Sequence, residues 1–177
     1  HDPNPVVMLE HKGLYWSKVP GTELAKTFEP DSEYIVPLGR ARVDQEANQE
    51  AIENGESCLV ITYGMGVYWA KAASKKFEGR VEILDLRTLN PIDWDAIKEA
   101  VSRHNKALVL TEEPLLNSFA ESLAGRISQH CFEILDAPVM AYGAENLPAI
   151  ALNVDLEKAM LPTPEKVEQQ IETLLNY

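Results

Sequence analysis

From about residue 58 to the end of the chain, short apolar runs alternate with segments whose apolar residues recur at helical spacing. Four predominantly apolar runs lie at 58–63, 81–86, 107–111 and 139–142. Short runs of this kind are typical of strands that are buried on both faces of a sheet. Segments with helical spacing separate them. The pattern therefore predicts parallel strands joined by right-handed crossovers, with helices on both faces of the sheet.

Three of the expected helices have recognisable starts. Asp93, Ser118 and Thr163 can each accept a hydrogen bond from the first turn of a following helix. Glu121, three residues after Ser118, completes a capping box, and Pro164 occupies the first helical position after Thr163. We therefore expect a helix after each of the last three strands.

The first forty residues are organised differently. Val6–Glu10 is a short apolar run after two prolines and predicts a strand. Residues 11–40 show no sustained period and contain several prolines, which predicts a linker or an extended arm. The chain begins at His1 without a methionine, so we expect a fragment of a longer protein. Some apolar residues of the arm are expected to pack on another surface, namely Leu14, Tyr15, Trp16 and Phe28.

Composition narrows the classes of partner. The 177 residues include 28 acidic and 16 basic side chains, for a net charge of −12. A duplex-binding protein needs a basic stripe, and the sequence has none, so nucleic acid is not an expected partner. The same charge would repel an anionic membrane surface. It favours solubility and a basic protein partner instead.

The cysteines and histidines do not form a recognisable reactive motif. Cys58 and Cys131 are far apart in apolar segments, which predicts small core residues in a reducing compartment. No pair of cysteines or histidines has zinc-ligand spacing, and no nucleophile signature is present. His104 is expected at the end of a helix, where a cation suits the helix dipole, and His130 is expected on a helix, pointing away from the adjacent Cys131. We interpret both histidines as structural.

Gly64-Met65-Gly66 follows the first buried strand, at the place where a dinucleotide-binding fold has its phosphate loop. The full fingerprint needs a third small residue, but that position is Trp69. A tight turn from strand to helix is therefore the favoured interpretation, and a nucleotide-binding module is the weaker alternative.

Charged residues follow two of the predicted strands at the edge where open α/β sheets usually build their sites. They are Asp85, Arg87, Glu112 and Glu113. Paired carboxylates beside an arginine could perform acid–base chemistry or bind a cation. They could equally form an ion-paired cluster that fixes the loops, with Arg87 held by one carboxylate. We favour this structural interpretation.

Several short motifs occur in a fixed order along nearly the whole chain, at 6–12, 37–41, 61–64, 85–93, 112–114, 132–138, 156–157 and 161–163. Their order resembles the beta-type subunits of thiamine-diphosphate-dependent 2-oxo acid dehydrogenases. The Leu-Arg-Thr-Leu-Asn-Pro-Ile-Asp motif is also similar to transketolase-like relatives, whereas the Leu-Asp-Ala-Pro motif and the ending narrow the choice of family.

The resemblance implies a transketolase C-terminal-like domain at 41–177, preceded at 1–40 by the end of a pyrimidine-binding domain and a linker arm. The implied fold is a three-layer αβα sandwich. Its five-stranded mixed sheet would have an antiparallel first strand at Ala41–Gln45. The implied parent oxidatively decarboxylates a 2-oxo acid, of the branched-chain 2-oxoisovalerate or the pyruvate type, on thiamine diphosphate with Mg²⁺, and passes the acyl group to a lipoyl arm.

The same resemblance implies that this chain lacks the catalytic centre. The Gly-Asp-Gly diphosphate motif and the catalytic glutamate of the family are not in the sequence. We therefore expect no catalytic, cofactor-binding or metal-binding residue here, and no activity of the isolated chain. The C-terminal domain of a transketolase or of a deoxyxylulose-phosphate synthase is the alternative.

The partners implied by the resemblance are an alpha-type subunit and the lipoyl acyltransferase core. Asp136 and the carboxylate of Tyr177 would contact the small basic binding domain of that core, although Asp136 could instead simply turn the chain before Pro138. Trp16, Trp69 and neighbouring apolar residues are too many for one small core, which predicts a homodimer. The implied location is the bacterial cytoplasm, or the mitochondrial matrix of a eukaryote.

Overall fold

The computed structural model describes residues 2–16 and 19–177. The chain divides into two compact units, with the boundary between residues 34 and 35. The first unit contains a short helix α1 (Lys12–Tyr15) and a 3₁₀ turn η1 (Glu23–Ala25). The strand predicted at 6–10 is wrong, since this segment is irregular and its Val7 and Leu9 are more than 80% exposed. A strand needs a hydrogen-bonded neighbour, and the described part of this unit supplies none.

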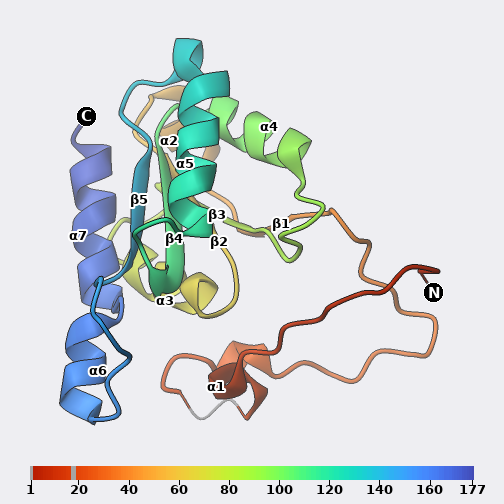
Figure 1. Cartoon of the computed structure of the whole chain (residues 1–177). Helices are drawn as coiled ribbons and strands as arrows, with labels where there is room; N and C mark the ends of the chain where they lie inside the picture. The colour runs from red at the N-terminus through yellow and green to blue at the C-terminus, as the bar shows by residue number, and fades with distance from the viewer. Residues whose placement is uncertain (1, 17–18) are drawn as a thin grey trace. The chain divides into compact units, whose positions relative to one another are not determined.

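The second unit is built on a five-stranded mixed sheet with the order β1-β3-β2-β4-β5 (Figure 1). β1 runs antiparallel to β3, and the other pairs are parallel. The predicted mixed sheet with an antiparallel first strand is therefore confirmed. The strands are β1 (Arg42–Gln45), β2 (Cys58–Thr62), β3 (Val81–Asp85), β4 (Ala107–Pro114) and β5 (Met140–Ala144).

Helices cover both faces of this sheet. On one face, α4 and α5 pack with side chains of β2, β3 and β4 into a continuous apolar core. On the other face, α3 and α7 lie against each other and against the central strands. The helices are α2 (Gln49–Glu53), α3 (Met65–Ser74), α4 (Trp94–His104), α5 (Phe119–His130), α6 (Val154–Met160) and α7 (Pro164–Leu175), with a 3₁₀ turn η2 (Phe132–Ile134) before β5.

The predicted helix caps are present. Asp93 accepts a hydrogen bond from the Ala96 amide at 3.2 Å, and Ser118 accepts one from the Glu121 amide at 2.9 Å. Thr163 caps α7 in the same way. Each cap satisfies an amide that the helix itself cannot bond. The sequence pattern thus located three helix starts to the residue.

The turn between β2 and α3 depends on its glycines. Gly64 has φ +57°, a left-handed conformation that glycine adopts without strain. A Cβ on Gly66 would lie 2.0 Å from Oγ1 of Thr62, which itself donates a hydrogen bond to the Leu110 carbonyl. The second glycine therefore makes room for a buried side chain of this chain. Its position supports the tight-turn interpretation.

Candidate functional site

The charged residues predicted at the carboxyl edge of the sheet do not form one cluster. Asp85 ends β3, and Glu112 and Glu113 lie near the end of β4, with β2 between the two strands. Asp85 is paired with Arg42 of β1, whose Nη2 lies 3.9 Å from its Oδ2. Burial raises the pKa of Asp85, and the nearby Asp44 acts in the same direction. The cationic partner of Asp85 thus comes from the antiparallel edge strand.

Arg87 is held by its backbone. Its amide donates to Oδ1 of Asp85 at 3.1 Å, and its φ is +55°. Left-handed backbone is uncommon for a residue with a Cβ. The side chain is exposed, and within residues 2–16 and 19–177 its guanidinium forms no ion pair. The ion pair foreseen for the Arg87 side chain is therefore not formed among the described residues, and its contact with Asp85 is made by the backbone amide.

Glu113 forms the centre of a second group. Its Oε1 accepts a hydrogen bond from the Phe119 amide at 2.9 Å, at the start of α5. The hydroxyls of Tyr63 and Thr111 lie 3.2 and 3.3 Å from the same oxygen. Burial raises the pKa of Tyr63, and the neighbouring Glu113 adds to the shift. A carboxylate with three donors on one oxygen joins β2, β4 and α5, and it is poorly placed to act as a free base.

A buried polar network was missed by the sequence analysis. Nδ1 of His104 lies 2.7 Å from Oγ of Ser57, and its Nε2 lies 3.1 Å from Oε2 of Glu82. Serine, histidine and glutamate in this order resemble an acyl-transfer triad, but Ser57 is only 1% exposed, so a substrate cannot reach it. The one sequence signal was Glu82, a carboxylate inside an otherwise apolar strand.

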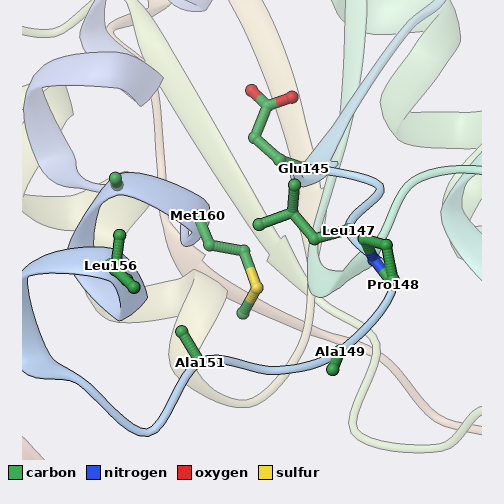
Figure 2. Close-up of a pocket in the computed structure, with 8 residues that line it drawn as sticks. Glu145, Leu147, Pro148, Ala149, Ala151, Leu156 and Met160 are labelled. Atoms are coloured by element: carbon green, nitrogen blue, oxygen red, sulfur yellow. The ribbon is translucent and has the colours of Figure 1, made fainter.

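A hollow of about 440 Å³ lies between the β5–α6 connection and α6 (Figure 2). Its walls are almost entirely apolar, and Glu145 is the one charged residue. Thiamine diphosphate would need cations or amide donors for its phosphates, and the lining contains no lysine, arginine or histidine. The hollow therefore does not fit the cofactor. The lining residues are Glu145, Leu147, Pro148, Ala149, Ala151, Leu156, Ala159 and Met160.

Other site types are also missing from the described part of the chain. No group of three or more histidine, cysteine, aspartate or glutamate side chains is arranged to hold a metal ion there. Within the same residues, no helix combines the length and the apolar content that are needed to cross a bilayer.

The two residues predicted to contact a partner lie at the opposite end of the sheet from Asp85 and Glu113. Asp136 is exposed in the loop between η2 and β5, and its amide donates to the Asn105 carbonyl at 2.9 Å. Tyr177 is 63% exposed after α7. In Figure 1 the C-terminus lies at the end of the sheet where β5 starts. The structure brings the two residues to one end of the unit.

Comparison with known proteins shows the family to which this chain belongs. The family described as "Transketolase, C-terminal domain" matches residues 47–167, which is more than half of the chain. A solved split-gene transketolase, an inactive beta4 tetramer, has the same fold, with a TM-score of 0.65 over 82% of this chain and 45% of its own, at 17% identity. The chain belongs to the transketolase C-terminal domain family.

Within this class the chain is similar to beta subunits of 2-oxo acid dehydrogenases, which confirms the resemblance read from the sequence. It is 34% identical to the 2-oxoisovalerate dehydrogenase subunit beta of Bacillus subtilis, over 99% of this chain and 50% of that protein. It is 27% identical to the pyruvate dehydrogenase E1 component subunit beta of Rhizobium meliloti, over 98% of this chain and 35% of that protein. The chain spans half or less of these two relatives.

Proposed function

We propose that this chain is the C-terminal part of the beta-type component of a decarboxylating 2-oxo acid dehydrogenase, and that it serves assembly and docking. The parent would decarboxylate a 2-oxo acid on thiamine diphosphate with Mg²⁺ and transfer the acyl group to a lipoyl arm. The observation that carries the proposal is the 34% identity to a 2-oxoisovalerate dehydrogenase beta subunit along 99% of this chain. This identity favours a branched-chain substrate over pyruvate.

The proposal that this chain assembles the enzyme but does not bind the cofactor can be tested with thiamine diphosphate. Asp85 and Glu113 at the carboxyl edge are engaged in contacts within the chain, and the lining of the hollow near α6 contains no cationic side chain for a phosphate. We therefore expect no heat when thiamine diphosphate and Mg²⁺ are titrated into the chain in a calorimeter. The parent enzyme, with its alpha-type subunit, is the positive control and should turn over 2-oxoisovalerate. Tight binding by the chain alone would contradict the proposal.

Docking to the acyltransferase core is proposed at Asp136. Its exposed carboxylate and the net charge of −12 suit the small basic binding domain of that core. Tyr177 would add its own carboxylate in a chain that ends at this residue. A carboxylate at the rim of an interface mainly affects the association rate and its salt dependence.

The docking proposal is tested by titrating the binding domain of a 2-oxoisovalerate dehydrogenase complex into this chain. Asp136→Asn should weaken binding about threefold to tenfold, and more at low than at high salt. Asp155→Asn is the matched control because Asp155 is an exposed aspartate of α6. Equal affinities of the two variants would show that Asp136 is not part of the binding site.

Assembly is proposed to involve an alpha-type subunit and a second copy of this chain. The two tryptophans support a homodimer less than the sequence indicates, because Trp69 is only 8% exposed. Trp16 is 59% exposed. A mass of one chain in light scattering at high concentration would exclude the homodimer.

Relatives occur in bacteria and, in Caenorhabditis elegans, as a mitochondrial protein, so we propose the bacterial cytoplasm or the mitochondrial matrix as the location.

A further inference from the structure

The last two residues of α4 and the two residues before β4, Arg103 to Lys106, contact several neighbouring segments; we call these four residues the α4–β4 junction. Nη2 of Arg103 lies 2.5 Å from Oε1 of Glu82 on β3. At the other end of the junction, Nζ of Lys106 donates to the Gly55 carbonyl at 3.1 Å, and the Lys106 carbonyl accepts from the Leu59 amide of β2 at 2.9 Å. The junction therefore fixes the start of two strands.

His104 is the buried centre of the junction. Its side chain is fully buried, and both ring nitrogens have a polar neighbour, Ser57 on one side and Glu82 on the other. Burial alone would raise the pKa of Glu82, but the contacts with His104 and Arg103 outweigh it and lower the pKa below its ordinary value. The imidazole is therefore held by one hydrogen bond, to Ser57, and by the close carboxylate of Glu82, which Nε2 approaches without hydrogen-bond geometry.

Asn105 connects this centre to the surface. It has φ +57°, and its amide closes the end of α4 by donating to the Val101 carbonyl at 2.8 Å. Its own carbonyl accepts the amide of Asp136 at 2.9 Å. The position of the Asp136 backbone thus depends on a left-handed turn, and the residue before that turn is His104.

We propose that the buried Ser57–His104–Glu82 network is a positioning device that holds the α4–β4 junction and, through Asn105, fixes the loop that presents Asp136. Asparagine tolerates the left-handed conformation better than most residues, but the turn still needs support from its surroundings. The buried contacts of His104 with Ser57 and Glu82 supply that support one residue away. Only the consequence for partner binding rests on the docking function proposed for Asp136.

Amide hydrogen exchange of the full chain tests the device without any partner. In His104→Asn the new amide can reach Ser57 but is too short for Glu82, and in His104→Gln it can reach Glu82 instead. We expect the Asp136 amide to exchange at least tenfold faster in one or both variants. The Lys166 amide, capped by Thr163 in α7, should change less than twofold. An unchanged Asp136 amide, or equal acceleration of both amides, would overturn the proposal.

Two further variants keep the test informative. Ser57→Ala removes one contact of the imidazole with little change in volume and should also accelerate exchange at Asp136. Glu99→Gln removes the exposed partner of Arg103, whose Nη1 lies 3.1 Å from the Glu99 carboxylate, and should leave Asp136 within twofold. Acceleration by Glu99→Gln equal to that by Ser57→Ala would show that the buried contacts are not the cause.

Binding of the acyltransferase binding domain then measures the consequence. His104→Asn should weaken binding about threefold to tenfold, and it should have no further effect in an Asp136→Asn chain, because the device acts through Asp136. Additive losses would contradict this coupling. If the unaltered chain does not bind the domain, the docking proposal fails, while the exchange experiment still decides whether the device exists.

Discussion

Replacing Gly66 by alanine should destabilise the protein, although alanine is normally the better residue in a helix. A Cβ at this position would lie 2.0 Å from Oγ1 of Thr62, a distance that real atoms do not adopt. Thr62 is fully buried and bonded to the Leu110 carbonyl, so it cannot turn away freely. The substitution therefore forces a shift between β2 and the first turn of α3.

The magnitude follows from three opposing effects. Overpacking of a dense core costs about 1–3 kcal/mol. Loss of the hydrogen bond of Thr62 costs about 1 kcal/mol more. Replacing glycine by alanine inside a helix returns about 1 kcal/mol. We expect a net loss of about 1–3 kcal/mol in the free energy of unfolding, measured by urea denaturation followed by circular dichroism.

Gly125→Ala is the control because Gly125 is exposed on α5 and an added Cβ meets nothing within 4 Å. It should stabilise the protein by about 0.5–1 kcal/mol. In addition, Thr62→Ala should relieve the contact, so the double variant with Gly66→Ala should lose less than the two single variants together. A Gly66→Ala protein as stable as Gly125→Ala would refute the reasoning.

Three other predictions concern single side chains. The pKa of Glu82 is lower in the folded chain than in the unfolded one, so the ionised carboxylate adds to the free energy of unfolding at pH values above about 4.3. This contribution is lost as the pH falls further. In Glu82→Gln, the free energy of unfolding measured in urea should therefore fall less steeply on the acid side. Ser118→Ala removes the cap of α5 and should cost about 1 kcal/mol in thermal unfolding, whereas Ser122→Ala, inside the same helix, should be nearly neutral. Burial raises the pKa of Cys58 to about 12, so iodoacetamide at pH 8 should label it, by mass spectrometry, only after unfolding in urea; rapid labelling of the native chain would contradict its burial.

The elements that could be predicted are those whose signal is local. The strands near 58 and 107 and the helix after Ser118 depend on short apolar runs and on a cap, which a sequence displays directly. The strand predicted at Val6–Glu10 was wrong because an apolar run also needs a neighbouring strand. The short helices α2 and α6 were missed because five and seven residues are too few to show a helical stripe.

The candidate site was predictable only as a location. Parallel strands bring their carboxyl ends to one edge, so Asp85 and Glu113 were expected there. Their partners were not predictable, since Arg42 comes from an antiparallel strand and Tyr63 reaches Glu113 from 50 residues away. His104 and Ser57 are separated by 47 residues, and only the three-dimensional structure places them in contact.

The distribution of charged groups along the sheet bears on the docking role proposed for Asp136. Open α/β sheets usually build their sites at the carboxyl ends of the strands. Here that edge holds Asp85 near Arg42 and Glu113 against the start of α5, so both carboxylates are engaged in contacts within the chain. At the other end Asp136 projects its carboxylate from a backbone that Asn105 holds in place. A fixed, exposed carboxylate on an acidic protein is suited to select a basic partner, and its removal should change binding while leaving the fold intact.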